Sequence, residues 1–283
     1  MEIKRVGVVG CGLMGSGIAE VCARSGYHTV VSEANKELLE RGLTAIRTSL
    51  AKGVERGKLT KKDEEAALSL LKGTTGVKDF ADCDLVVEAI VENLTEKKKM
   101  FTTLDIICRP HAILVSNTSC LPLTEMAVAT KRRQNVVGLH FFNPVPLMKL
   151  VELVRTELVS EDTVKTAKQF GESLGKTVIV AKDTPGFIVN RLLIPYLIDA
   201  IKIYEAGLAT KEDIDQGMML GCSHPIGPLS LADFIGLDTT NYIAQAMYEE
   251  LKDAKVAPPV LLKRMVAAGR LGRKTGKGFY DYK

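Results

Sequence analysis

Short apolar runs and amphipathic segments alternate along roughly the first two thirds of the chain. The apolar runs lie at residues 6–9, 29–31, 84–91, 112–115, 135–139, 150–154 and 177–180. Helical patterns, with apolar side chains at spacings of three and four, separate most of these runs. Strands that alternate with helices are typical of a mainly parallel sheet with helices on both faces. The pattern therefore predicts an α/β fold, with a doubly wound Rossmann-type sheet over residues 1–183.

Residues 36–72 form a longer segment than a simple crossover between two strands requires. Their pattern indicates two amphipathic helices with a break near residues 57–60, and Thr60 is a suitable N-cap for the second helix. We therefore predict a helical projection near residues 36–72 that extends from the sheet and can touch a long substrate.

The pattern changes at Asp183-Thr184-Pro185-Gly186, after which only helical periodicity remains. Because proline suits the first turn of a helix, Pro185 is expected to begin the first of these helices. We predict helices over residues 185–206, 210–220, 227–236, 238–252 and 258–269. The chain is thus expected to form two domains, an α/β domain at 1–183 and an all-helical domain at 184–283.

The first apolar run leads directly into a glycine-rich turn, Gly10-Cys11-Gly12-Leu13-Met14-Gly15. In a Gly-x-Gly-x-x-Gly turn the first glycine permits the tight turn, the second lets a pyrophosphate approach the backbone, and the third lets the next helix pack closely. The N-terminus of that helix offers unpaired N–H groups to the phosphates. We expect Gly10, Gly12, Leu13, Met14 and Gly15 to bind a dinucleotide.

An acidic residue, Glu33, stands eighteen positions after Gly15 at the end of the second apolar run. A carboxylate there can accept hydrogen bonds from the adenosine ribose and would repel a 2′-phosphate. This favours NAD over NADP as the cofactor, although the neighbouring Ser32 and Lys36 can soften the preference.

Composition excludes several other classes of protein. The 283 residues are 46% hydrophobic and 25% charged, with a net charge of +4 that is spread along the chain. A nucleic-acid partner is not expected, since no polybasic block with interleaved aromatic residues occurs. No apolar run is long enough to span a membrane, and a strand beginning near Ile3 leaves no room for a targeting peptide.

The six cysteines are scattered and form neither a Cys-x-x-Cys pair nor a cluster with histidine. The sequence therefore indicates no metal site and no disulfide framework. Reduced thiols of this kind are typical of a cytoplasmic protein.

Among the four histidines, His140 stands out because it ends an apolar run, and ligands of open α/β sheets bind beyond the carboxyl ends of strands. Glu152 lies in the middle of the next apolar run, where a carboxylate is costly to bury without a partner. If the two strands are neighbours, Glu152 can pair with His140 and hold its imidazole in one tautomer. A core histidine beside an edge-strand glutamate fits the same positions, and both interpretations remain open.

Three further sets of residues have a functional and a structural interpretation. Ser116-Asn117-Thr118-Ser119 follows a strand on the same rim as His140, but it can equally be a helix N-cap. Asn190 can point its amide toward the cleft between the domains or face solvent. Ser49, Lys52 and Arg56 share one helix face, which can meet phosphates or be a solvated charged face.

Six motifs, taken together and in this order, resemble the L-3-hydroxyacyl-CoA dehydrogenase family, above all its short, single-function members. They are residues 10–15 (GCGLMG), 87–93 (VEAIVEN), 116–119 (SNTS), 140–144 (HFFNP), 183–187 (DTPGF) and 274–280 (KTGKGFY). The resemblance covers essentially the whole chain. It implies reversible NAD-dependent oxidation of short-chain (3S)-3-hydroxyacyl-CoA thioesters to 3-oxoacyl-CoA, in a homodimer joined through the helical domain, which also contributes to the substrate site.

The resemblance also implies roles for individual residues. His140 would be the general base for the substrate's 3-hydroxyl, Glu152 would orient it, and Ser119 and Asn190 would hold the substrate oxygen. Glu92, Lys97 and Asn117 would lie at the cofactor, and Ser49, Lys52 and Arg56 at coenzyme A. Cys120 stands where the family usually has a serine, which leaves Ser119 intact.

Two other functions are compatible with the same architecture. One is a related dehydrogenase of a free hydroxy acid or sugar acid, which dependence on coenzyme A would separate from the first. The other is a non-enzymatic NAD-binding protein, against which the intact set of Ser119, His140, Glu152 and Asn190 argues.

Overall fold

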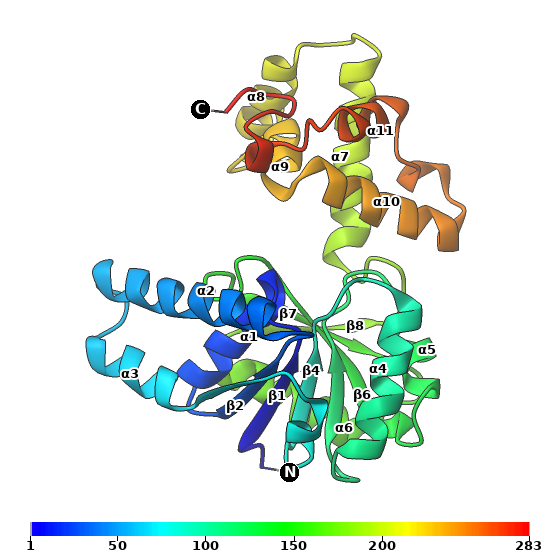
Figure 1. Ribbon diagram of the computed structural model, residues 1–283. Helices are drawn as coiled ribbons and strands as arrows, with labels where there is room; N and C mark the ends of the chain where they lie inside the picture. Colours follow the sequence, from blue (N-terminus) through cyan, green and yellow to red (C-terminus); the bar gives the residue numbers. More distant parts are fainter. Residues whose placement is uncertain (1, 283) are drawn as a thin grey trace. The chain divides into compact units, whose positions relative to one another are not determined.

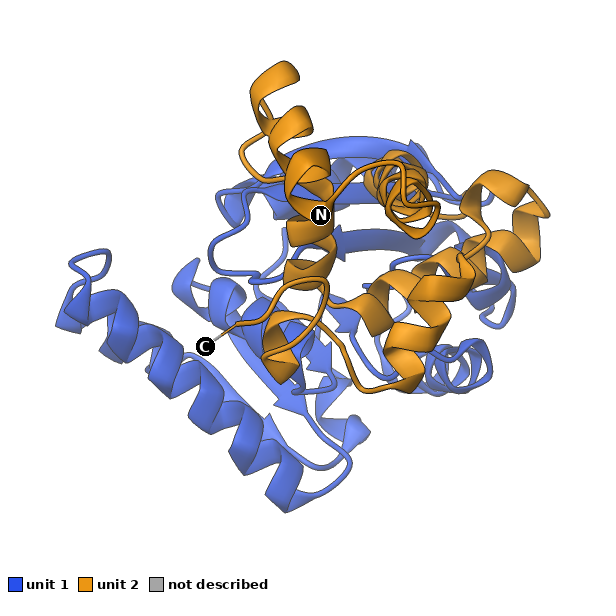
Figure 2. Cartoon of the chain, turned by 90° about the horizontal axis from the view of Figure 1, so that it is seen from above, with its two compact units in different colours: residues 1–183 blue, residues 184–283 orange. Residues whose placement is uncertain are grey.

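A computed structural model describes residues 2–282 of the chain. The contacts divide it into two compact units, which meet in the sequence between Asp183 and Thr184 and are coloured separately in Figure 2. The first of them, unit 1, contains the sheet, and the second, unit 2, is helical.

Unit 1 is built on one eight-stranded sheet with the strand order β3-β2-β1-β4-β5-β6-β7-β8 (Figure 1). The strands are β1 Arg5–Val9, β2 His28–Ser32, β3 Leu71–Thr74, β4 Leu85–Glu88, β5 Ile113–Ser116, β6 Val136–Phe141, β7 Leu150–Arg155 and β8 Thr177–Lys182. Neighbouring strands are parallel except β6 and β7, which are antiparallel. The predicted doubly wound, mainly parallel sheet is confirmed.

Four of the six α-helices of unit 1 begin at a residue whose side chain accepts a hydrogen bond from one of the first helical N–H groups. Asn35, Thr60, Asn93 and Ser160 each cap a helix with a side-chain oxygen. The helices are α1 Leu13–Arg24, α2 Lys36–Glu55, α3 Lys61–Ser69, α4 Leu94–Ile107, α5 Leu123–Val128 and α6 Glu161–Ser173, with short 3₁₀ turns η1 Val77–Phe80 and η2 Arg133–Asn135.

Helices α2 and α3 form the pair that the length of residues 36–72 predicts, and they lie side by side next to α1 (Figure 1). Thr60 caps α3 in a complete capping box with Asp63, as its position between the helices suggests. The sequence pattern missed strand β3, which begins at Leu71. That strand is short and carries Lys72 and Gly73, so it has no apolar run.

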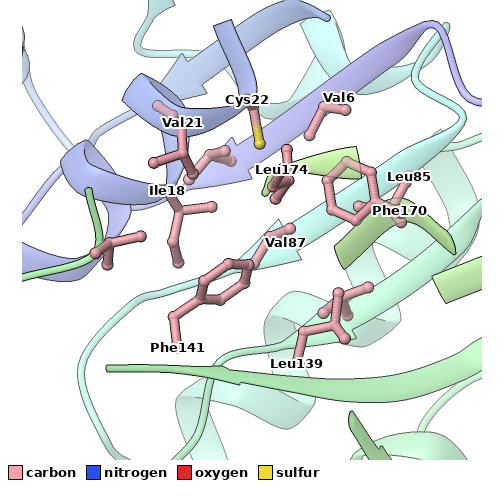
Figure 3. Close-up of a cluster of buried hydrophobic side chains, with 14 of the residues drawn as sticks. Val6, Ile18, Val21, Cys22, Leu85, Val87, Leu139, Phe141, Phe170 and Leu174 are labelled. Carbon is pink, nitrogen blue, oxygen red and sulfur yellow. The ribbon is translucent and has the colours of Figure 1, made fainter. Parts of the chain in front are cut away.

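An apolar cluster fixes α1 against the sheet (Figure 3). Ile18, Val21 and Cys22 point from one face of α1 toward buried side chains of the strands, among them Val87. Because burying apolar surface is the main favourable term in packing, this cluster holds the start of α1 at the carboxyl edge of β1.

Unit 2 contains helices and, in its described part, only isolated β-bridges besides. The helices are α7 Val189–Glu205, α8 Lys211–Gly221, α9 Pro228–Ile235, α10 Leu237–Leu251 and α11 Val260–Ala267, with η3 Ala254–Val256 and η4 Arg273–Thr275. The predicted all-helical character is confirmed. Within residues 2–282, no helix combines the length and apolar character needed to cross a membrane.

The prediction that the first helix of unit 2 begins at Pro185 is wrong. Residues 184–187 form a turn in which Gly186 and Phe187 have positive φ angles of 79° and 49°, and α7 begins only at Val189. A helix cannot propagate through left-handed residues, so the proline belongs to the turn and not to the helix.

The C-terminal segment of unit 2 is held by a buried aspartate of α9. The carboxylate of Asp233 accepts the backbone N–H groups of Phe279 and Tyr280, both at 2.9 Å, and the hydroxyl of Tyr282 at 3.0 Å. A Cβ atom on Gly278 would lie 1.9 Å from the same carboxylate. Packing against Asp233 therefore explains why a glycine and aromatic residues stand near the C-terminus.

Candidate active site

The glycine-rich turn after β1 has the shape that a pyrophosphate requires. A Cβ atom at Gly10 would lie 2.6 Å from the carbonyl oxygen of Ala89, and one at Gly15 would lie 1.9 Å from the carbonyl oxygen of Gly10. At Gly12, by contrast, a Cβ atom would meet nothing within 4 Å. The chain is tightly packed behind the turn and open in front of it, at the N-terminus of α1, so these residues fit a dinucleotide phosphate.

Glu33 directly follows β2, the neighbour of β1 in the sheet, and is half-buried. One of its carboxylate oxygens accepts the backbone N–H of Ala34 at 3.1 Å. Burial, together with the charge of Glu33, raises the pKa of the Cys11 thiol to about 11. The cysteine inside the glycine turn is therefore a neutral thiol at physiological pH, and Glu33 supplies the negative charge beside it.

His140 and Glu152 are directly opposite one another on the antiparallel strands β6 and β7. The imidazole Nδ1 lies 2.7 Å from a carboxylate oxygen of Glu152, and both side chains are buried. The two strands are thus the neighbours that the pairing requires. The buried glutamate has a hydrogen-bond partner, and the imidazole is held with Nε2 directed away from Glu152.

The other ring nitrogen of His140, Nε2, lies 3.1 Å from the hydroxyl of Ser119. The ring of Phe142 packs beside the imidazole, with 4.6 Å between the ring centroids. An imidazole with a carboxylate on one nitrogen and a hydroxyl at the other can take a proton from, or give one to, a group bound next to that hydroxyl.

The loop that carries Ser119 leaves the carboxyl end of β5. Asn117, the first residue after β5, is buried, and its amide oxygen accepts the backbone N–H of Phe141 at 2.9 Å. The side chain of Asn117 therefore holds the loop that carries Ser119 against strand β6, which carries His140. This structural contact is separate from the role at the cofactor that the resemblance implies for Asn117.

Three charged side chains, two of them fully buried, lie next to the loop that carries Ser119. The ammonium of Lys97 is 2.6 Å from a carboxylate oxygen of Glu88 and 3.1 Å from one of Glu92, and Lys97 is only 1% exposed. Glu92 in turn accepts the backbone N–H of Ser119 at 2.9 Å and the hydroxyl of Thr118 at 2.5 Å.

Sequence reasoning missed Glu88 as part of the site, although a signal for it existed. Glu88 is a carboxylate inside an apolar run, as Glu152 is, and a buried carboxylate requires partners. The sequence predicts a partner only for Glu152, because the apolar run before it ends in a histidine.

Asn190 is the second residue of α7 in unit 2 and is buried. The interpretation that it faces solvent is therefore wrong. Its role toward the substrate stays a prediction of the resemblance.

The basic helix face of α2 borders a pocket of about 190 Å³ in unit 1. Ser49, Lys52 and Arg56 all line it, and so do three charged residues that sequence reasoning missed: Glu20, Arg24 and Lys58. Pro144, Pro146, Leu147, Leu59 and Gly53 complete the walls. The pocket combines an apolar side with a cluster of cations, an arrangement that suits a long ligand with phosphate groups.

One carboxylate organises part of this pocket. Glu20 lies 3.4 Å from a guanidinium nitrogen of Arg24 and is hydrogen-bonded to Ser49. Burial raises the pKa of Glu20, and the contacts with Ser49 and Arg24 act in the opposite direction. Across residues 2–282, no carboxylate within 4 Å neutralises Lys52, Arg56 or Lys58, so the pocket carries excess positive charge.

No group of three or more histidine, cysteine or acidic side chains that could hold a metal ion occurs in the described part of the chain. The cysteines at 11, 22, 83, 108, 120 and 222 form no disulfide bonds, and five of the six are buried.

Comparison with known proteins identifies the family of both units. Residues 5–184 match the family described as 3-hydroxyacyl-CoA dehydrogenase, NAD binding domain, and residues 186–282 match 3-hydroxyacyl-CoA dehydrogenase, C-terminal domain. The 3-hydroxybutyryl-CoA dehydrogenase of Mycobacterium tuberculosis is 50% identical over 282 residues, which cover 99% of both chains. The human mitochondrial hydroxyacyl-coenzyme A dehydrogenase is 45% identical over 288 residues, covering 99% of this chain and 92% of the human one.

Two solved structures superpose closely on this chain. The crystal structure of M. tuberculosis FadB2 superposes with a TM-score of 0.98 at 49% identity, and that of (S)-3-hydroxybutyryl-CoA dehydrogenase PaaH1 from Ralstonia eutropha with 0.95 at 43%. Each comparison covers the whole of both chains.

Proposed function

The chain belongs to the 3-hydroxyacyl-CoA dehydrogenase family, and from that premise we propose that it catalyses the reversible NAD-dependent oxidation of (S)-3-hydroxybutyryl-CoA to acetoacetyl-CoA. The observation that carries the proposal is the imidazole of His140, which is held between Glu152 at 2.7 Å and Ser119 at 3.1 Å. A base in this setting suits the removal of one hydroxyl proton.

The residues divide the work of the proton transfer. Glu152 accepts a hydrogen bond from the Nδ1–H group of His140, so that Nε2 has its lone pair directed toward the substrate. In the oxidation, Nε2 takes the proton of the 3-hydroxyl group, and the carboxylate of Glu152 stabilises the imidazolium that forms. In the reduction, the same nitrogen returns the proton. Ser119 and Asn190 hold the substrate oxygen through hydrogen bonds.

The glycine turn and Glu33 fit NAD, as the open front of Gly12 and the half-buried carboxylate indicate. Gly10, Gly12, Leu13, Met14 and Gly15 hold the pyrophosphate, while Glu92, Lys97 and Asn117 lie toward the nicotinamide half. Bound NAD would supply the acceptor for the hydride from carbon 3 of the substrate. The protein supplies the binding surface and the orientation.

Coenzyme A binds along the helical projection in this proposal. The cations Lys52, Arg56, Arg24 and Lys58 surround the pocket beside α2, and its apolar wall suits the pantetheine arm. Ser49 offers a hydroxyl at the same surface. A free hydroxy acid or sugar acid has no phosphate groups for these cations to bind.

An assay at 340 nm with acetoacetyl-CoA tests reaction, substrate and cofactor together. We expect rapid oxidation of NADH and little of NADPH, because the carboxylate of Glu33 repels a 2′-phosphate. Equal rates with both cofactors would contradict the role of Glu33 and point to Ser32 and Lys36 as phosphate contacts. No turnover with acetoacetyl-CoA, but turnover of free acetoacetate or a sugar acid, would contradict the assignment of the substrate.

We also propose that the protein works as a homodimer joined through unit 2. This unit exposes large apolar side chains, with Leu192 of α7 72% exposed and Leu220 of α8 81% exposed. Where such side chains gather into a contiguous patch, the patch marks an interface. Light scattering coupled to gel filtration should give twice the mass of the chain, and a monomer would contradict the proposal. We also propose that the protein works in a reducing compartment, the cytoplasm, since its six cysteines form no disulfide bonds.

A further inference from the structure

Glu88 occupies an unusual place for a glutamate. It ends β4 in the centre of the sheet, paired in register with Val9 of β1 and Ser116 of β5, and its side chain is completely buried. A charged carboxylate in such a place is costly unless all its contacts compensate for the loss of water. The contacts of Glu88 therefore indicate the role of this side chain.

Both oxygens of Glu88 are used. One accepts the ammonium of Lys97 at 2.6 Å and the backbone N–H of Ile90 at 2.8 Å, and the other accepts the hydroxyl of Ser116 at 2.7 Å. Each of the two side-chain partners has a second contact, and in both cases that contact leads into the loop that carries Ser119.

The first route runs through charges. Lys97 contacts Glu92 at 3.1 Å, and Glu92 holds the loop by accepting the N–H of Ser119 at 2.9 Å. The hydroxyl of Ser119 then lies 3.1 Å from Nε2 of His140.

The second route runs through hydroxyls. The oxygen of Ser116, oriented by Glu88, accepts the backbone N–H of Thr118 at 3.2 Å. The hydroxyl of Thr118 donates to Glu92 at 2.5 Å, where the two routes meet.

We propose that Glu88 is a positioning residue that sets the distance between Ser119 and His140. It acts by sharing Lys97 with Glu92 and by orienting Ser116, and it does not touch the substrate. Without its charge, Lys97 has only Glu92 as a carboxylate partner and draws it away from the N–H of Ser119, because a buried ammonium needs compensation. The inference rests on the proposed role of Ser119 at the substrate oxygen.

A double-mutant cycle between Glu88→Gln and Ser119→Ala tests this chain of contacts. We expect E88Q to lower kcat by about tenfold or more, since displacements of about 1 Å can cost up to a hundredfold. In the S119A background the same change should alter kcat by less than about twofold, since its effect passes through the missing hydroxyl. Equal factors in both backgrounds would overturn the proposal, because a purely structural loss adds independently.

Asp84→Asn is the matched control. Asp84 is a buried carboxylate at the opposite end of the same strand segment, where it accepts the backbone N–H groups of Lys4 and Arg5. We expect D84N to destabilise the fold without moving kcat. If E88Q does not fold, Ser116→Ala cuts the second route alone, and the same lack of additivity with S119A is expected at smaller size. Additive effects there would likewise count against the proposal.

A readout that is independent of turnover separates this inference from the proposed function. In NMR spectra of the ¹⁵N-labelled imidazole, E88Q should shift the Nε2 signal of His140 in the same direction as S119A does, and should add nothing to S119A. An unchanged Nε2 signal in E88Q would overturn the proposal even if the wild-type enzyme proved inactive with acetoacetyl-CoA, which would count against the substrate assignment.

Discussion

Unit 1 and unit 2 both bury carboxylates, but the groups that these carboxylates bind differ. In unit 1, Glu152 accepts a hydrogen bond from the imidazole of His140, the proposed general base. In unit 2, Asp233 accepts hydrogen bonds from the backbone N–H groups of Phe279 and Tyr280 and from the hydroxyl of Tyr282. Burial and the contact with Asp233 raise the pKa of the Tyr282 hydroxyl to about 12, so all three groups stay hydrogen-bond donors at neutral pH. Burial is equally deep in both cases.

The difference shows that the depth of burial alone does not separate a functional carboxylate from a structural one. A carboxylate that binds groups such as backbone N–H affects only the stability of the fold, because those groups take no part in the reaction. A carboxylate that binds a general base influences the reaction itself, because it orients that base and stabilises its charged form. Glu152 and Asp233 should therefore respond in opposite ways when they are neutralised.

Replacement of His140 by alanine should give the largest effect. The variant should lose more than about a hundredfold in kcat, the contribution expected of a general base. Binding of NADH, measured by fluorescence titration, should stay close to that of the wild type, because the glycine turn is untouched. His111→Ala, at an exposed histidine, is the control. Near-normal turnover in H140A would show that another group is the base.

Glu152→Gln asks whether the carboxylate of unit 1 acts through its partner. By analogy with carboxylates that orient metal-bound histidines, we expect kcat to fall by about 10- to 100-fold. The thermal midpoint, followed by circular dichroism, should change little, since glutamine fills the same volume. Glu161→Gln, at an exposed carboxylate, serves as the control. A variant that kept its activity but melted early would place Glu152 in the structural class with Asp233.

Asp233→Asn should show the reverse pattern in unit 2. The amide places an NH₂ group against an N–H donor, and each unsatisfied buried group costs about 1–3 kcal/mol. The thermal midpoint should therefore drop by several degrees, while kcat of the protein that remains folded stays close to normal. Asp281→Asn, at an exposed aspartate of the same segment, should change neither quantity. Loss of kcat at unchanged stability would break the comparison.

Lys52 and Arg56 represent a third situation, charges for which the structure records no carboxylate partner within 4 Å. Replacing both by glutamine should raise the KM for acetoacetyl-CoA severalfold, as expected for the loss of two exposed contacts worth up to about 1 kcal/mol each. The kcat and the thermal midpoint should not move, and the KM for acetoacetyl-pantetheine should be unaffected. Arg47→Gln on the same helix is the control. Equal changes for both thioesters would exclude a phosphate contact.

Local patterns allowed several parts of the fold to be predicted from the sequence. The glycine turn, seven of the eight strands and the helical character of unit 2 depend on residues that are close together in the chain, and the structure contains them all. The break between α2 and α3 and the N-cap at Thr60 could also be predicted, because capping is a contact between residues only three positions apart.

Other features could not be predicted because their signal is weak or their partners are distant in the sequence. Strand β3 has no apolar run, so only its pairing with β2 makes it a strand. Because Gly186 and Phe187 have positive φ angles, they form a turn, and α7 begins after it. The sequence did not indicate this turn, because Pro185 is a residue that suits the first turn of a helix. Arg24 and Lys58 join the pocket beside α2 only after α1 and the α2–α3 break are packed together.

The sequence by itself determined that this protein has a dinucleotide-binding turn, a doubly wound sheet and a separate helical unit, because each of these follows from local periodicity and from glycine and proline placement. It also supplied His140 and Glu152 as candidates. Only the tertiary structure decided that they touch, and that Glu88 lies behind Ser119 through Lys97 and Glu92. The physical reason is that a contact between strands depends on sheet order and register, which are set by the packing of the whole core and not by any one segment.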